Sequence, residues 1–294
     1  MRHSLSDPLP RLRISLEIFP PRSAEQAEKL WQVVERLRPL GPEYVSVTCG
    51  AGGNYAGGTA EAVETLRTRL GLAARPHLTA MSADRADIEH AARDYWSRGV
   101  RRIVALRGDP PTGFEPPADA FPFAAEVVAA LRRIGDFEIA VAGYPEAHPE
   151  SPSADADLVQ LKRKVDAGAC EVITQYCFDT DRVLRFRDAM ASHGIDAKLV
   201  VGIMPVHNYA QIARFSARCG ASMPVWLGAL FEGLDDDPET TRAVAATVGA
   251  EQCRRLAAEG LTELHFYTLN KAELTFAVGR LLGLNGVAPE RAAA

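Results

Sequence analysis

The chain has 294 residues, of which 47% are hydrophobic and 24% are charged, an ordinary balance for a globular protein. A formal net charge of −5 offers no basic surface for nucleic acid, and no apolar run is long enough to cross a bilayer. The cysteines show no CxxC spacing and indicate reduced thiols in a cytoplasmic protein without disulfides or structural zinc: Cys49, Cys170, Cys177, Cys219 and Cys253.

The first predicted strand, in the segment ISLEIFPPR that begins at Ile14, sets the pattern for the chain. Aliphatic residues occupy one parity and Ser15 and Glu17 the other, the period of two that is typical of a strand. The two prolines lack a backbone N–H and end the strand. Glu17 is therefore expected near the C-terminal end, on the face opposite the aliphatic side chains.

Seven further predicted strands follow, at residues 44–48, 77–80, 102–106, 138–142, 171–175, 199–203 and 263–269. Helical spacing predicts helices at 24–38, 59–70, 84–96, a segment ending at 133, 155–167, 180–193, 208–219, 238–259 and 271–282. Ser23 is the expected N-cap of the first helix, and 225–231 is an extra apolar segment.

Eight strands that alternate with helices predict an α/β fold, a single (β/α)8 TIM-type barrel with an extra helical segment between the seventh and eighth strands. A doubly wound open sheet is the competing architecture. We expect residues 1–13 to form a flexible leader, 14–286 the barrel and 287–294 a C-terminal tail.

Strand parity separates side chains that pack under the helices from those that face the lumen. In the fourth strand it assigns Val104 and Leu106 to the helices, and Ala105 and Arg107 to the lumen. Polar residues gather where the strands end, which is where active sites of this fold lie. They are Glu17, Thr48, Arg107, Asp109, Tyr144, His148 and Gln175. We therefore expect a site at this end of the barrel, with small lumen residues leaving room for a flat ligand.

Simpler interpretations of single residues remain open. Arg107 and Asp109 could pair with each other, and Lys164 could lie on the solvated face of a helix. Glu146 and His148 lack the spacing of zinc ligands and have no third ligand nearby, so no metal is expected. The loop GAGGNYAGG misses the GxGxxG spacing of dinucleotide sites, and the sequence has no Gly-x-Ser-x-Gly elbow or P-loop.

Long motifs in order across nearly the whole chain resemble one family. They are SLEIFPPR, YVSVTCGAGG, PHLTAMSAD, ARDYWSRGVRRIVALRGDPP, AGYPEAHPES, DLVQLKRKVDAGACEVITQYCFD, VGIMPVHN, LFEGLDDD and LHFYTLNKAE. The sequence closely resembles the bacterial 5,10-methylenetetrahydrofolate reductases, flavoproteins of one-carbon metabolism and methionine biosynthesis. The resemblance implies a (β/α)8 barrel that binds FAD non-covalently at the C-terminal ends of its strands.

The resemblance also implies roles for single residues. Glu17 matches the general acid, and a partly desolvated carboxyl group is expected to have a raised pKa. Asp109 matches an aspartate near the flavin and the pterin, where it would act electrostatically. The positions expected to bind folate or the nicotinamide donor are Thr48, Gln175, Gln211, Phe215 and Lys271.

The positions that match the family's FAD site are Thr48, His77, Arg107, Gly108, Asp109, Phe123, Ala124, Tyr144, His148, Asp157, Arg163 and Lys164. Arg107 and Lys164 would offset pyrophosphate charge, Asp157 would accept from ribose hydroxyls, and Tyr144 would pack along the isoalloxazine. By the resemblance, Lys164 faces the cofactor instead of solvent.

The resulting hypothesis is a cytoplasmic, homo-oligomeric, FAD-dependent methylenetetrahydrofolate reductase that transfers hydride by a ping-pong route from NADH or NADPH. Lys271 stands where relatives carry an arginine that reads the folate glutamate tail, and lysine lacks the bidentate geometry of arginine. The alternatives are a flavin-free or repurposed folate one-carbon enzyme, for example in a demethylation pathway, and a non-catalytic barrel that binds folate or flavin.

Overall fold

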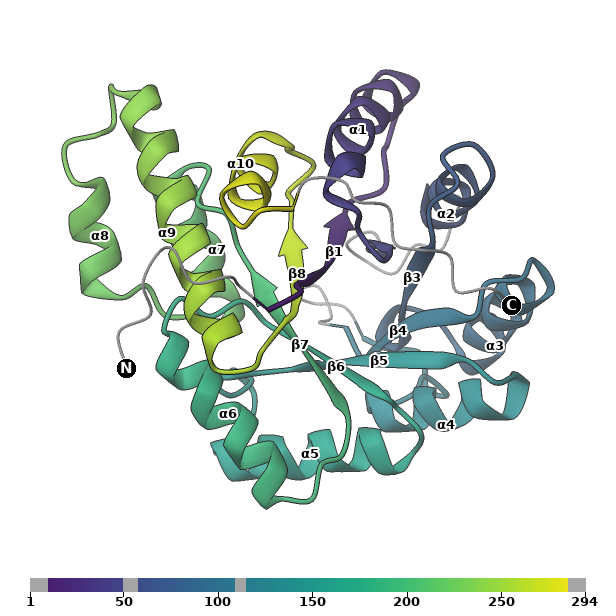
Figure 1. The fold of residues 1–294 in the computed structure, drawn as a ribbon. Coiled ribbons are helices and arrows are strands. Elements are labelled where there is room, and N and C mark those ends of the chain that lie inside the picture. The colour runs from purple at the N-terminus through teal and green to yellow at the C-terminus, as the bar shows by residue number, and fades with distance from the viewer. Residues whose placement is uncertain (1–9, 50–57, 109–114, 285–294) are drawn as a thin grey trace.

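The computed structural model of the protein describes residues 10–49, 58–108 and 115–284. Eight parallel strands close into a barrel in sequence order, β1 to β8, and the helices lie outside it (Figure 1). The barrel closes where β1 pairs with β8, from Arg13 opposite Glu263 to Glu17 opposite Tyr267. This arrangement confirms the predicted TIM-type barrel and excludes the open sheet.

The strands are β1 (Arg13–Ile18), β2 (Val45–Val47), β3 (Ala74–Thr79), β4 (Arg102–Leu106), β5 (Glu138–Gly143), β6 (Glu171–Thr174), β7 (Lys198–Ile203) and β8 (Glu263–Tyr267). The helices are α1 (Ala24–Leu37), α2 (Gly58–Thr68), α3 (Arg85–Ser97), α4 (Ala124–Ile134), α5 (Ala154–Asp166), α6 (Thr180–Ser192), α7 (Tyr209–Cys219), α8 (Val225–Phe231), α9 (Pro238–Ala258) and α10 (Glu273–Leu281). Two short 3-10 turns, η1 (Arg38–Leu40) and η2 (Ala80–Ser82), complete the set. Ser23 caps α1 as expected, because its side chain accepts from the backbone N–H of Gln26.

The extra segment between β7 and β8 is helix α8, which lies beside α9 at the edge of the barrel (Figure 1). Its presence confirms the predicted insertion. The strands and helices from Arg13 to Leu281 all belong to this one barrel and the layer of helices around it. The expected leader and tail lie largely outside the described residues, so the domain limits stay a prediction.

The main core lies between the barrel and the helices, and strand parity accounts for most of it. Ile14, Leu16 and Ile18 of β1 are buried there, as are Val45 and Val47 of β2. Their neighbours of opposite parity, including Ser15, Ser46 and Glu17, face the lumen. Both faces of these strands are covered, which is the usual state of parallel sheets in this fold.

The parity prediction is wrong for β4. Val104 joins an apolar cluster inside the lumen with Leu106, whereas Ala105 packs in the outer core. The register explains the reversal: Val104 pairs with His77 of β3, and laterally paired residues of a sheet face the same side. Aliphatic side chains fill barrel interiors as readily as they pack under helices, so hydrophobicity alone did not identify the outer face.

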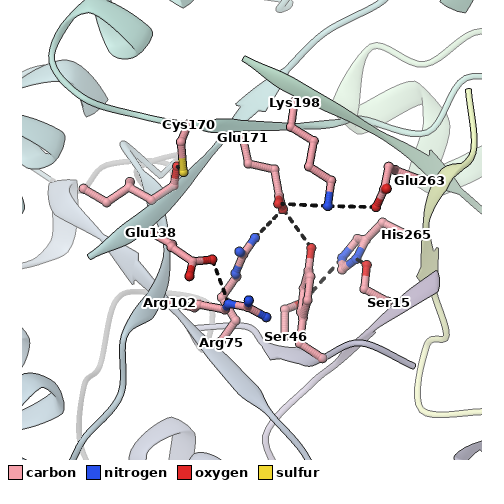
Figure 2. A network of polar contacts seen from close by, with 12 residues as sticks. Ser15, Ser46, Arg75, Arg102, Glu138, Cys170, Glu171, Lys198, Glu263 and His265 are labelled. Atoms are coloured by element: carbon pink, nitrogen blue, oxygen red, sulfur yellow. Dashed lines mark hydrogen bonds and ion pairs between the residues drawn. The ribbon is translucent and has the colours of Figure 1, made fainter. Parts of the chain in front are cut away.

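The N-terminal end of the lumen holds a network of charges around the buried Arg75 and Glu171 (Figure 2). Glu171 of β6 pairs with Arg75 of β3 and accepts a hydrogen bond of 3.0 Å from the Tyr44 hydroxyl. Lys198 of β7 lies 3.8 Å from Glu171 and 2.8 Å from Glu263. Burial alone would raise the pKa of Glu171, but Arg75, Lys198 and Tyr44 outweigh burial and hold that pKa below its ordinary value. This network closes the end of the barrel opposite the predicted site.

Candidate active site

A cavity of 1170 Å³ opens at the C-terminal ends of the strands. Its lining includes five of the residues that the sequence predicted for this end of the barrel: Glu17, Thr48, His77, Tyr144 and Gln175. The rest of the lining comes largely from the segment 19–24 after β1, the start of α2, and strands β4, β5, β6 and β8, which contribute Leu106, Ala142, Ile173 and Tyr267. The predicted location of the site is therefore occupied by a cavity that is lined by both polar and apolar side chains.

Glu17, at the end of β1, lies between two imidazoles. Its Oε2 is 3.5 Å from Nε2 of His77 and 3.5 Å from Nε2 of His265, and its side chain is 15% exposed. The carboxylate is thus nearly enclosed by protein and still borders the cavity. A group in this position can exchange a proton with a ligand in the cavity.

The expectation of a raised pKa for Glu17 is wrong for the protein alone. Burial acts to raise this pKa, but the contact with His265 and the electrostatic attraction to His77 and His265 outweigh burial. The pKa of Glu17 therefore lies below its ordinary value. The sequence-based argument considered desolvation and omitted the histidine that β8 places beside the acid.

His77, on β3, has a buried nitrogen with no hydrogen-bond partner among the described residues. Its Nε2 faces Glu17 at a geometry that does not form a hydrogen bond. Burial lowers the pKa of His77 to about 4, although Glu17 acts in the opposite direction, so the ring is neutral at neutral pH. A buried nitrogen without a partner beside a cavity indicates room for a polar ligand group.

His265 of β8 was missed by the sequence analysis and is the most buried member of the site, with no exposed surface. Its Nδ1 lies 2.7 Å from the Ser15 hydroxyl, and the Tyr44 ring stacks on it at a centroid distance of 6.0 Å. These contacts fix the ring so that Nε2 points toward Glu17. The signal that could have identified it is the alternation in ELHFY, where His265 and Tyr267 share the parity of the lumen.

Tyr267 forms the floor of the cavity. Its hydroxyl donates to the backbone oxygen of Thr174 at 2.8 Å, so the side chain spans the lumen from β8 to β6. The ring crosses over Gly202 of β7, where an added Cβ would lie 2.6 Å from the ring and 2.3 Å from the Thr174 oxygen. Glycine at 202 is what permits this close approach.

A second polar group lies after β4 and β5, next to the cavity residue Tyr144. The rings of Tyr144 and His148 meet edge to face at 4.7 Å, and the backbone N–H of His148 donates to Asp157 at 3.3 Å. Arg107 forms an ion pair with Glu150. The structure thus brings Arg107, from the end of β4, close to the group formed by Tyr144, His148 and Asp157 after β5.

Lys164 belongs to this group and points inward from α5. Its ammonium donates to the backbone oxygen of Ala142 at 2.6 Å. Burial lowers the pKa of Lys164 to about 8, although Asp157 opposes the shift, while burial raises the pKa of Asp157 against the charge of Lys164. Lys164 is not itself in the cavity lining, but the backbone oxygen that it contacts belongs to the cavity residue Ala142.

The remaining predicted positions lie at the surface, outside the lining of this cavity. Phe215, on α7, is 38% exposed, and Phe123, at the start of α4, is 46% exposed. Ala124 and Gln211 are half-buried, and Arg163 and Lys271 are exposed. These side chains do not meet Glu17 within the described part of the protein.

Asp109 lies outside the described residues, so the structure does not place its side chain. The preceding Gly108 has a φ of +83°, and a Cβ there would lie 2.0 Å from Cγ2 of Thr79. Glycine is therefore required for the turn that follows β4.

In the described part of the chain, no cluster of histidine, cysteine or acidic residues fits a metal ion, and no helix has the length and hydropathy of a membrane span.

Comparison with known proteins identifies relatives over nearly the whole length. The family model described as methylenetetrahydrofolate reductase matches residues 7–283. The 5,10-methylenetetrahydrofolate reductase of Pectobacterium carotovorum is 44% identical over 285 residues, covering 97% of this chain and 94% of the relative. The enzyme of the same name from Escherichia coli is 43% identical, covering 97% and 95%.

Among solved structures, a Clostridium thermocellum protein described as binding two copies of 5-methyl-5,6,7,8-tetrahydrofolic acid has a TM-score of 0.64. It is 13% identical and covers 92% of this chain, with 94% of its own chain covered. At that identity the likeness supports the barrel fold alone.

Proposed function

Because this chain belongs to the methylenetetrahydrofolate reductase family, we propose that it reduces 5,10-methylenetetrahydrofolate to 5-methyltetrahydrofolate with a non-covalent FAD and with NADH or NADPH as donor. When bound, FAD supplies a hydride carrier, so that donor and folate would use the cavity in turn. The observation that carries the proposal is Glu17, nearly enclosed between two histidines at the edge of that cavity.

The described residues fit a flavin dinucleotide in two respects. The cavity lining offers the apolar side chains of Leu106, Ala142 and Ile173 together with the unpartnered nitrogen of His77, which suits a flat ring with polar edges. The neighbouring group offers the buried ammonium of Lys164 for pyrophosphate charge and the carboxylate of Asp157 for ribose hydroxyls. The exposed Arg163 contributes least to this fit.

Glu17 would act as general acid toward the folate. Opening of the five-membered ring of the substrate requires a proton at N10, and a carboxylic acid at the cavity edge can deliver it. In the protein alone the pKa of Glu17 is lowered, which favours the carboxylate. Ligands that exclude water from the cavity would strengthen the opposing effect of burial and raise the pKa toward the working range.

Other residues have proposed roles, which for Gln175 rest on its place in the cavity lining and for the rest on the family to which the chain belongs. Gln175 borders the cavity and its side-chain oxygen accepts from the backbone N–H of Tyr176 at 3.0 Å, which leaves its amide hydrogens for a ligand. Phe215 and Gln211 of α7 would contact whichever substrate is bound, and Lys271 would meet the acidic folate tail. Asp109 would influence the flavin through its charge.

A Glu17→Gln variant tests the assignment of the acid. The amide cannot donate an acidic proton, so we expect NADH to reduce the bound flavin at the wild-type rate while methylenetetrahydrofolate no longer reoxidises it. Anaerobic stopped-flow absorbance at the flavin band measures both half-reactions separately. Reoxidation by folate at the wild-type rate would refute the role of Glu17.

The wild-type protein tests the proposal as a whole. A purified protein with flavin absorbance that oxidises NADH or NADPH only when methylenetetrahydrofolate is present supports it. A protein that takes up no FAD would favour the flavin-free alternative, and flavin uptake without turnover would favour a binding role. The cytoplasmic location and the homo-oligomer expected from the sequence stay predictions.

A further inference from the structure

The side chain of Asn270 makes two hydrogen bonds to the backbone of a residue 251 positions earlier, Phe19. Its Oδ1 accepts from the Phe19 N–H at 2.8 Å, and its Nδ2 donates to the Phe19 carbonyl oxygen at 3.0 Å. Phe19 lines the cavity and follows the proposed acid, Glu17, by two residues. Asn270 lies in the loop between β8 and α10, next to Lys271. The side-chain amide of Asn270 thus links the loop after β8 to the segment that follows β1.

These bonds extend the β1–β8 ladder beyond its last paired residues. The regular register ends with Glu17 opposite Tyr267. Thr268 then donates twice to the Glu17 carbonyl oxygen, from its N–H at 3.3 Å and from its hydroxyl at 2.6 Å. The N–H of Asn270 donates in turn to the Thr268 hydroxyl at 3.1 Å. The primary amide of Asn270 takes the place of a peptide group, so the backbone from Glu17 to Phe19 is held at both ends.

The chemistry of position 270 admits few side chains. Asn270 has a φ of +56°, and Leu269 before it a φ of +51°, two consecutive residues in the left-handed region that L-residues rarely adopt. Asparagine tolerates this region better than most residues and carries both a donor and an acceptor. Glycine tolerates the left-handed region but has no side-chain amide, and aspartate has the acceptor but lacks the donor. Strained backbone of this kind persists where surrounding contacts determine it, which occurs often at functional sites.

We propose that Asn270 is a positioning residue that holds the carboxyl group of Glu17 at the reacting edge of the folate. The inference rests on the proposed function, since it assigns a purpose to the placement of the acid. The imidazole nitrogens of His77 and His265 each lie 3.5 Å from the Glu17 carboxylate, so the position of the acid relative to them also depends on the backbone that carries it. Reduction of the flavin by NADH requires no proton from Glu17 and should not depend on Asn270.

The test uses the flavin-loaded full-length enzyme with Asn270→Gly and Asn270→Asp variants. The glycine variant relieves the left-handed strain and removes both hydrogen bonds to Phe19. The effect of losing these bonds can therefore be separated from a loss of stability. We expect reoxidation by methylenetetrahydrofolate to slow by about 10- to 100-fold, since misplacement of a catalytic group by about 1 Å has an effect of that order. Aspartate keeps the bond from the Phe19 N–H and should fall between glycine and wild type. Reduction by NADH should stay within about twofold of wild type in both variants.

Asp237→Ala is the matched control, because Asp237 caps α9 by accepting from Thr240 at 3.0 Å and lines no part of the cavity. It should weaken the fold and leave both half-reactions unchanged. Wild-type folate reoxidation in Asn270→Gly overturns the inference, and so does an equal loss of both half-reactions. If Asn270→Gly does not fold, Asn270→Asp tests the inference by the same comparison between the rate of reoxidation by folate and the rate of reduction by NADH. Failure of the proposed function is distinguishable, because the wild-type enzyme itself would then not reduce the folate.

Discussion

The lowered pKa of Lys164 gives a prediction about stability that does not require catalysis. Its ammonium is withdrawn from water at the inner face of α5, and burial lowers the pKa from 10.5 to about 8 despite the attraction of Asp157. Since a tenfold change in a protonation constant is about 1.4 kcal/mol, this fall corresponds to about 3 kcal/mol of destabilisation when the lysine is charged. Replacement of Lys164 by methionine should remove that cost.

The dependence on pH follows from proton linkage. Below about pH 8 the lysine is protonated in both states, and the folded protein carries the full cost of its charge. Between about 8 and 10.5 the folded state has lost the proton and the unfolded state retains it, so the wild-type free energy of unfolding rises with pH. Lys164→Met lacks this rise. At pH 7 the lost bond to the Ala142 oxygen offsets about 1 to 2 kcal/mol, leaving the variant more stable by about 1 to 2 kcal/mol.

Urea unfolding of the FAD-free protein at several pH values between about 7 and 10 measures the difference between Lys164→Met and wild type. Other groups that titrate in this range are common to both proteins and largely cancel. Lys162→Met is the control, since Lys162 lies two residues away in an exposed pair with Asp166 and should show no such trend. A difference that does not change with pH would refute the reasoning. The same variant should bind FAD more weakly, because it lacks the charge proposed to meet the pyrophosphate.

Two further substitutions test the packing that supports the site. The Arg75→Met variant removes the buried partner of Glu171 and leaves it with Lys198, 3.8 Å away. The free energy of unfolding, measured by urea titration at pH 7, should fall by about 3 to 5 kcal/mol. Because the pKa of Glu171 is lowered in the fold, this loss should shrink as pH falls toward that pKa, and a loss that does not shrink would contradict the pairing. Gly202→Ala places a Cβ 2.3 Å from the Thr174 oxygen and should destabilise by about 1 to 3 kcal/mol while displacing the Tyr267 ring. Unchanged thermal stability and unchanged ligand affinity in Gly202→Ala would refute that close approach.

The sequence identified the barrel and the end at which the cavity lies, because these depend on strand alternation and on where strands stop. Glu17 was found this way, since its strand has aliphatic residues on one parity only. Val104 and Leu106 were misplaced because the lumen has an apolar half, which hydrophobicity cannot distinguish from the outer core.

Pairing across the barrel could not be predicted from local patterns. Arg75 was missed because the predicted third strand began at His77, after a proline that disfavours a strand interior, whereas β3 begins at Ala74. The contact of His265 with Glu17 joins residues 248 positions apart and depends on closure between β1 and β8. The pKa of Glu17 was therefore predicted in the wrong direction, because its sign is set by that partner.

Two titratable groups bear directly on the proposed function, Glu17 and Lys164, and burial acts on the pKa of each. The histidines favour the carboxylate of Glu17, whereas an acid catalyst needs its proton. Burial lowers the pKa of Lys164 to about 8, so its ammonium persists at pH 7 but at a cost in free energy. One class of ligand would oppose both effects together. A flat ring that excludes water favours protonation of Glu17, and a pyrophosphate beside Lys164 favours its ammonium. The proposed dinucleotide would therefore offset the cost of burying the Lys164 ammonium and favour the acid form of Glu17.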